Sequence, residues 1–91
     1  MDEPVNQYRL EFKKPAKKDL QRIDQISQRR LIKKLKFFMS QPDPLAYAKP
    51  LVGRREGNYR WRVGVYRIVF DVRADAILIL RVQHRGEVYR R

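Results

Sequence analysis

The chain has 91 residues, and we expect one small domain over residues 1–91, because this length suffices for a single core but not for separate catalytic and recognition domains. It carries 22 Lys and Arg against 10 Asp and Glu, a formal net charge of +12, while 43% of its residues are apolar, so a folded cationic protein is expected and simple disorder is excluded. This charge favours an anionic partner: a nucleic acid, an acidic protein or an anionic membrane surface.

The chain contains no cysteine, which excludes disulfides, a thiol nucleophile and a cysteine-based zinc site. The single histidine, His84, and the scattered carboxylates lack metal-ligand spacing, so we expect neither a metal nor another cofactor. The first residues are acidic and include a proline where a secretory signal has basic and then apolar residues, and no apolar run is of membrane-spanning length. We therefore expect a cytoplasmic protein without a membrane partner.

Residues 8–13 alternate apolar and polar side chains, which predicts a half-buried strand. Pro15 suits the first turn of a short helix whose apolar residues recur at helical spacing up to Ile23. A second helix is predicted to begin with Ser27 as its N-cap and to end near Ser40, followed by a turn with two prolines. The apolar stripe of this second helix is predicted to contain Ile26, Leu31, Leu35 and Phe38.

Three β-rich runs follow, at residues 59–63, 66–72 and 76–82, and short turns separate them. Connections this short join antiparallel strands as hairpins. The predicted fold is therefore α+β: an antiparallel sheet of four to five strands with an N-terminal helical hairpin packed on one face.

Lysine and arginine are distributed unequally along the chain. All eight lysines lie within residues 1–50, whereas ten of the fourteen arginines lie within residues 51–91. Arginine presents a planar fork of donors that matches phosphate and carboxylate groups. The arginine-rich half is therefore where we expect recognition of the anionic partner.

Gly64 and Val65 form a predicted two-residue hairpin loop, which sets the register of the two strands beside it. Trp61 and Ile68 then share the face toward the helices, whereas the arginines share the other face. Like charges directly opposite each other on a sheet oppose folding by about 0.2–1 kcal/mol, and a bound polyanion would reverse that sign. The face with the arginines is formed by Arg60, Arg62 and Arg67, and we interpret it as the site that binds a phosphodiester backbone.

Alternative interpretations of the same residues remain. Arginines on one side of an amphipathic sheet are usually solvated. Solvation is also the favoured interpretation of the lysine-rich face of the second helix, and help in holding an acidic protein partner is the alternative. Tyr59, Trp61 and Tyr66 could stack on bases, although the apolar spacing favours core packing for Trp61 and Tyr66. For Tyr59 both possibilities stay open.

Residues 51–91 resemble the core of the RelE branch of the RelE/ParE toxin superfamily. The strand and the two helices predicted before them also come in the order expected for that family. The resemblance rests on three features: the Arg60-x-Arg62 strand, the Tyr66-Arg67 pair that begins the next strand, and the ending HRGEVYR at residues 84–90. It implies a fold similar to microbial ribonucleases and a toxin of a type II toxin–antitoxin pair. Its partners would be an acidic cognate antitoxin, the ribosome and mRNA, which it would cleave in the decoding site.

Carried over from the family, the basic cleft positions fall on Arg60, Arg62 and Arg67, a further basic residue on Arg85, and the functional tyrosine on Tyr89. Well-known RelE-type members have lysine where this chain has Arg60 and Arg62. A lysine can act as a general base when its pKa falls, whereas arginine effectively cannot lose its proton, so the identity of the base is open.

Cleavage of RNA without a metal requires in-line attack of the ribose 2′-hydroxyl, which leaves a 2′,3′-cyclic phosphate and a 5′-hydroxyl. His84 has the unperturbed pKa best suited to the proton transfers, Tyr89 is a rival, and Glu87 more plausibly orients an arginine. A lone histidine is just as often a structural turn residue. Two other functions stay open: a ParE-like toxin that inhibits gyrase, and a non-catalytic nucleic-acid-binding module.

Overall fold

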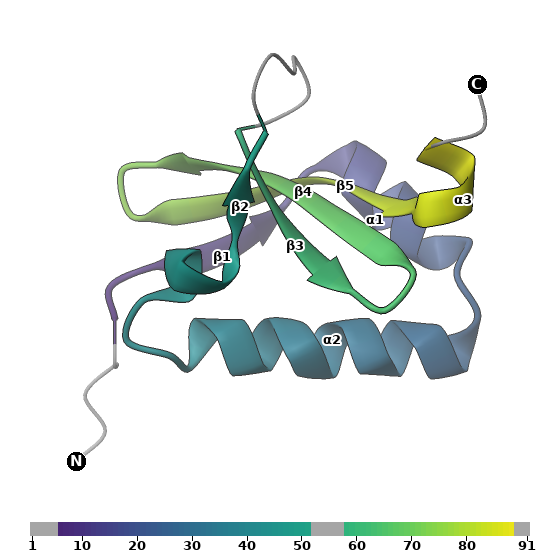
Figure 1. The fold of residues 1–91 in the computed structure, drawn as a ribbon, viewed down its shortest axis with the longest axis horizontal. Coiled ribbons are helices and arrows are strands. Elements are labelled where there is room, and N and C mark those ends of the chain that lie inside the picture. The colour runs from purple at the N-terminus through teal and green to yellow at the C-terminus, as the bar shows by residue number, and fades with distance from the viewer. Residues whose placement is uncertain (1–5, 52–57, 89–91) are drawn as a thin grey trace.

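Five strands form a mixed sheet, and the two N-terminal helices pack against it (Figure 1). The computed structural model describes residues 6–51 and 58–88. None of the helices in these ranges is long and apolar enough to cross a membrane. The elements are β1 (Arg9–Phe12), α1 (Lys14–Gln21), α2 (Gln25–Met39), the 3₁₀ helix η1 (Pro44–Tyr47), β2 (Lys49–Pro50), β3 (Tyr59–Val63), β4 (Tyr66–Arg73), β5 (Ala76–His84) and α3 (Arg85–Val88).

The strand order is β1-β5-β4-β3-β2. The three neighbouring pairs from β5 to β2 are antiparallel, as predicted, whereas β1 lies parallel to β5 with Arg9 opposite Ala76. The prediction of a wholly antiparallel sheet was therefore wrong at this edge. Parallel neighbours need a long crossover, and the helices and strands between β1 and β5 provide one.

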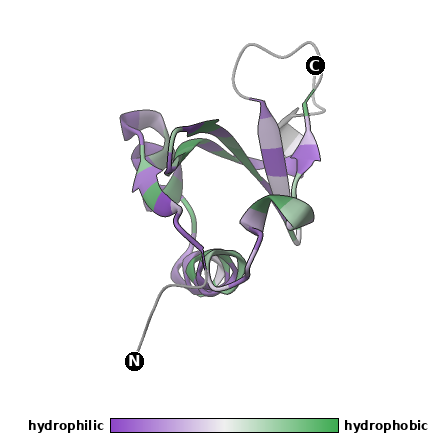
Figure 2. Ribbon diagram, turned by 90° about the vertical axis from the view of Figure 1, so that its left-hand side faces the viewer, coloured by the Kyte–Doolittle hydropathy of each residue, from purple (hydrophilic) through white to green (hydrophobic). Residues whose placement is uncertain are grey.

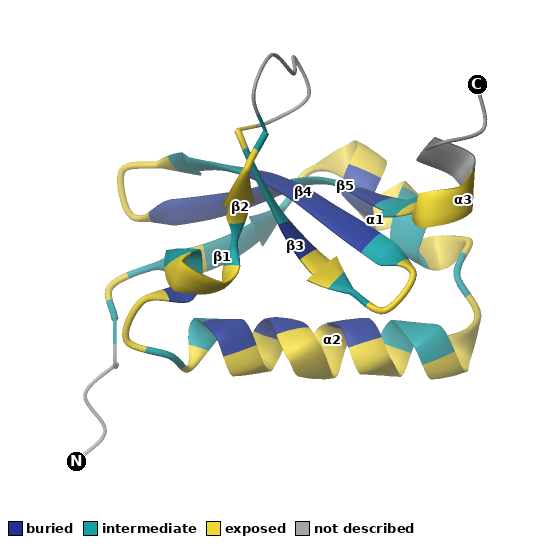
Figure 3. Ribbon diagram, in the orientation of Figure 1, coloured by how far each residue is buried: buried dark blue, intermediate teal, exposed yellow. Residues whose placement is uncertain are grey.

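Both helices contribute to the same core. The sheet arches over α2, which is seen end-on in Figure 2, and the buried residues of α2 face the sheet (Figure 3). Trp61 is fully buried at the centre, where its ring lies 4.7 Å from the Phe38 ring and 4.2 Å from the Phe70 ring, measured between centroids. Its indole N–H donates to the carbonyl oxygen of Pro44 at 3.1 Å. Trp61 thus packs as predicted and does not face a ligand.

The helix boundaries differ in detail from the prediction. Pro15 lies in the first turn of α1, as expected, and α1 ends at Gln21. Helix α2 begins earlier than predicted, because Asp24 and not Ser27 is its N-cap: the Ser27 N–H donates to Asp24 Oδ2 at 3.0 Å.

Ile26 does not belong to the buried stripe of α2, since 66% of it is exposed. Five residues separate Ile26 from Leu31, and at ~100° per residue this spacing turns Ile26 about 140° away from the stripe. Leu31, Leu35 and Phe38 are buried, as predicted, and Ser40 caps the end of the helix.

Two short elements after α2 were not predicted. Residues 41–44 were expected to form only a turn, but Pro44 begins η1, and the side chain of Asp43 accepts the Leu45 N–H at 3.1 Å. Strand β2 then adds two residues to the sheet edge, pairing Lys49 with Arg60.

A carboxylate from α1 fixes β5 where β1 ends. Asp19 accepts the Val82 N–H at 2.8 Å, and Arg81 donates to both Asp19 oxygens, from Nε at 2.8 Å and from Nη2 at 3.1 Å. The side chain of Asp19 is only 10% exposed. Asp19 thus links α1 to the backbone and to a side chain of β5.

Candidate active site

The β3–β4 hairpin brings the predicted arginines together. Its loop is Gly64-Val65, and Gly64 adopts φ +58°, a left-handed conformation that glycine tolerates without strain. Arg62 lies directly opposite Arg67, and Arg60 is on the same side of β3 two residues earlier. The predicted register is therefore confirmed.

Arg67 is buried within this arginine face, with only 8% of the residue exposed. Its Nη2 donates to Gln83 Oε1 at 3.4 Å, a long bond, and its Nε has no hydrogen-bond partner. A buried, unsatisfied charged donor costs more than ~1–3 kcal/mol unless a ligand completes its bonding. The Nε of Arg67 is thus a buried donor that no described group satisfies.

The arginine face continues across the sheet. Lys49 of β2, Arg60 of β3, Val69 of β4 and Arg81 of β5 stand in one row of register partners. Neither Gln83 nor Lys49 was predicted as a site residue. Nothing in the sequence before Arg60 revealed a strand at Lys49, and Gln83 is identified only through its pairing with Arg67.

The described acidic residues neutralise only part of the positive charge on this face. Arg81 is paired with Asp19, but the ion pairs in the described part of the chain do not include Arg60, Arg62 or Arg67. Guanidinium groups on adjacent strands that lack carboxylate partners form an anion-binding surface. Such donors can hold a phosphodiester and stabilise negative charge that develops on its non-bridging oxygens.

His84 lies on the other side of the sheet from Arg67. The strand register changes between Val69 and Phe70, where a bulge places an extra residue in β5 and reverses which of the following residues face the core. His84 consequently pairs with Tyr66, and their ring centroids are 5.4 Å apart. His84 Nδ1 also accepts the Gly86 N–H at 3.0 Å. These contacts fit a structural turn residue, which is the alternative that the sequence left open for His84.

The remaining predicted residues lie near the end of the described chain. Arg85 begins α3, is exposed, and its backbone N–H donates to the Val65 carbonyl at 2.7 Å, which holds α3 beside the hairpin loop. Tyr89 and the side chain of Glu87 lie outside the described residues. Within the described ranges, histidine, aspartate and glutamate form no cluster of three that could hold a metal ion.

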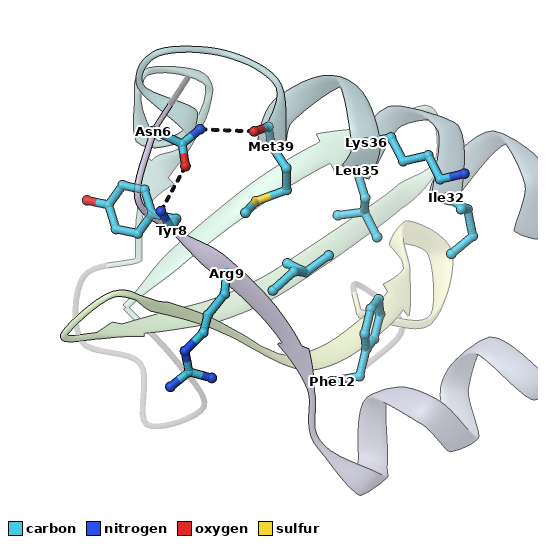
Figure 4. Close-up of a pocket in the computed structure, with 9 residues that line it drawn as sticks. Asn6, Tyr8, Arg9, Phe12, Ile32, Leu35, Lys36 and Met39 are labelled. Atoms are coloured by element: carbon cyan, nitrogen blue, oxygen red, sulfur yellow. Dashed lines mark hydrogen bonds between the residues drawn. The ribbon is translucent and has the colours of Figure 1, made fainter. Parts of the chain in front are cut away.

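A separate apolar groove of about 520 Å³ runs between β1 and α2, and its lining does not include Arg60, Arg62 or Arg67. Leu35 and Met39 point into it from α2, and Phe12 borders it from β1 (Figure 4). Asn6 closes one end, because its amide nitrogen donates to the Met39 carbonyl at 2.9 Å. Arg9 and Lys36 add positive charge to an otherwise apolar lining.

The fold and the site together define a small basic α+β protein in which one hairpin gathers arginines that have no ion-pair partner in the described part of the chain. Residues 10–89 match the family described as "ParE toxin of type II toxin-antitoxin system, parDE". The chain therefore belongs to the RelE/ParE superfamily of type II toxins.

Relatives of known identity lie on the RelE side of this superfamily. The chain is 39% identical over 51 residues to Toxin RelG of Mycobacterium tuberculosis, and this match covers 54% of the chain and 59% of RelG. Among solved structures, it is similar to the toxin–antitoxin complex RelBE2 of M. tuberculosis, with a TM-score of 0.72 and 30% identity over 86% of this chain and 98% of that one. The RelB–RelE complex of Methanococcus jannaschii gives a TM-score of 0.69 at 28% identity, covering 88% and 95%.

Proposed function

We propose that this toxin is an endoribonuclease that cleaves mRNA in the decoding site of the ribosome without a metal ion. The 2′-hydroxyl of a ribose attacks the adjacent phosphorus, the bond to the 5′ oxygen of the next nucleotide breaks, and a 2′,3′-cyclic phosphate and a 5′-hydroxyl result. The observation that carries the proposal is the buried Arg67, whose Nε has no hydrogen-bond partner and which stands directly opposite Arg62 in the hairpin. Similarity to RelE toxins supports the substrate.

In this proposal the arginines stabilise the transition state. The phosphorane carries more charge on its non-bridging oxygens than the substrate does, so donors fixed before the reaction act most strongly there. Loss of one such donor costs about 10²–10³ in rate in a well-studied enzyme. Arg67 is the best fixed of the three because it is buried, and Arg60 and Arg62 bind the phosphates on either side.

Proton transfer is assigned to the C-terminal segment. His84 is less suited than the sequence indicated, because it pairs with Tyr66 on the side away from Arg67. We therefore assign acid–base chemistry to Tyr89, the position of the functional tyrosine of the family, because guanidinium groups favour a phenolate. A hydrogen bond to the leaving oxygen is assigned to Arg85.

An acidic antitoxin is the proposed protein partner. The solved neighbours are antitoxin–toxin complexes, and the net charge of +12 favours a negatively charged polypeptide. The apolar groove beside β1 suits apolar side chains of such a polypeptide, while Arg9 and Lys36 suit its carboxylates (Figure 4). The strand β1 is also a sheet edge that an added strand can extend.

The test is primer-extension mapping of mRNA on translating ribosomes. We expect cuts with the parent, and losses of about 10²-fold or more with Arg67→Ala and with Tyr89→Phe. Arg73→Ala is the matched control, because Arg73 is an exposed arginine on the same strand and the same side, six residues away. Unchanged cleavage in both site variants would refute the assignment.

Gyrase inhibition is the second candidate, and the ParE description of the matching family favours it. A gyrase supercoiling assay run in parallel separates the two functions. Poisoned gyrase with intact mRNA would replace the nuclease proposal.

A further inference from the structure

A second cavity, of about 410 Å³, lies where α2, η1, β2 and β3 meet (Figure 1). Strand β2 pairs only with the first two residues of β3, so the rest of β3 has an open edge in the described part of the sheet. The floor of the cavity includes the buried ring of Phe38. Its walls carry two exposed aromatic residues and four cations: Phe37, Tyr47, Lys34, Lys49, Arg60 and Arg62.

The aromatic residues are unusually accessible for their size. Phe37 is 41% exposed and Tyr47 is 46% exposed, and their ring centroids lie 5.5 Å apart at an interplanar angle of 74°. Lys34 holds its Nζ 4.9 Å from the centroid of the Phe37 ring. No acidic residue lines the cavity among the described residues. Exposed rings surrounded by cations are what proteins use to bind single-stranded nucleic acid.

The cavity is continuous with the arginine face. Arg60 and Arg62 belong to both, and Arg62 stands directly opposite Arg67. Arg67 is therefore one register step across the sheet from a residue that lines the cavity.

We propose that this cavity binds one unpaired nucleotide of the RNA next to the scissile linkage, a role that rests on the proposed nuclease function. The base stacks on Phe37 or Tyr47, and its phosphate contacts Lys49 and Arg60. RNA fits this cavity better than a polypeptide does, because the lining combines aromatic rings with four cations. The groove between β1 and α2, in contrast, has a mostly apolar lining, which suits a polypeptide better.

The test measures binding separately from cleavage. The probe is a fluorescent 2′-O-methyl hexanucleotide, which cannot be cleaved because its 2′ oxygen is blocked, and the readout is the dissociation constant of the full-length toxin from anisotropy at fixed salt. At least one of Phe37→Leu and Tyr47→Leu, whichever removes the ring on which the base stacks, should weaken binding about 5- to 140-fold, the value of one stacked base. Phe37→Trp and Tyr47→Phe keep a ring and should restore affinity to within about twofold of the parent.

Two further controls make the result specific. Ile26→Ala removes an exposed apolar side chain at the other end of α2 and should leave affinity unchanged. A hexanucleotide without bases should bind the Leu variants and the parent equally, because stacking is then absent. Circular dichroism confirms that each variant is folded.

Three outcomes overturn the proposal: equal affinity of the parent and both Leu variants, no binding of the probe by the parent, or weakened antitoxin binding by the Leu variants with RNA affinity unchanged. The two proposals fail separately. Ring-dependent RNA binding without mRNA cleavage refutes the nuclease and keeps the cavity, whereas cleavage with ring-independent binding refutes the cavity and keeps the nuclease.

Discussion

Replacing Arg67 with methionine should stabilise the fold and abolish cleavage together. Methionine retains a long, flexible, apolar side chain in the same space but removes the charge and the donors. In the parent, Arg67 is 8% exposed, its Nε has no partner, and Arg62 stands opposite it. Each of these features opposes folding in the absence of a bound anion.

The expected gain can be worked from these contacts. Removing an unsatisfied buried donor returns about 1–3 kcal/mol, and removing the like charge opposite Arg62 returns about 0.2–1 kcal/mol. Loss of the long bond to Gln83 costs at most about 1 kcal/mol. The net gain in unfolding free energy is therefore between about 0.2 and 4 kcal/mol. A domain of this size gains ~4–8 °C in Tm per kcal/mol.

Urea denaturation of the purified toxin measures the change in unfolding free energy, and ribosome-dependent cleavage measures the change in rate. Arg73→Met is the matched control, since Arg73 is exposed on the same strand and should change stability by less than about 0.5 kcal/mol. An Arg67→Met variant that is less stable than the parent by 1 kcal/mol or more would show that the guanidinium is satisfied in the free toxin. The anion-site reasoning would then fail.

Three further changes test the fold. Asp19→Ala should lower the unfolding free energy by about 2–4 kcal/mol in urea denaturation, because it leaves both the Val82 N–H and Arg81 without their carboxylate, and a loss below 1 kcal/mol would contradict this. Arg81→Met should cost less than Asp19→Ala, because Asp19 keeps the Val82 bond; the same denaturation series checks the order. The hydrogen bond from the Ser27 N–H lowers the pKa of Asp24. The ionised Asp24 therefore stabilises the folded state fully above the ordinary carboxyl pKa, and this stabilisation is lost as pH falls through the lowered pKa. Asp24→Ala should therefore lower Tm at neutral pH, and the difference in Tm between this variant and the parent should shrink in strong acid. Thermal melts at several pH values measure this difference.

The hairpin of β3 and β4 could be predicted from local sequence alone. Apolar and basic residues alternate on both sides of Gly64, so only one register buries the apolar set, and the two-residue loop selects that register. The pairing of Arg62 with Arg67 follows from it. The burial of Arg67 does not, because alternation gives the side of the sheet and not the depth to which neighbouring strands cover it.

Features that depend on distant segments were missed. The pattern of residues 8–13 predicts a strand, but not that β1 lies parallel to β5. The bulge in β5 has no signal in its apolar run, yet it decides that His84 faces Tyr66 and not Arg67. The helix start was missed for a local reason: Asp24 and Ser27 are both good N-cap residues, and spacing alone did not choose between them.

The position of β5 in the sheet has a consequence for synthesis of the toxin. Among the described strands it is the last to be made, yet it lies between β1 and β4, and Arg9 of β1 pairs with a residue 67 positions later. At ~5–20 residues per second, translation takes about 3–13 s to bring these partners into existence together. Until then β1 has no neighbour and Asp19 has no strand to hold. A nascent chain therefore cannot close its sheet until β5 has been made, which gives the proposed antitoxin time to be present when the sheet closes.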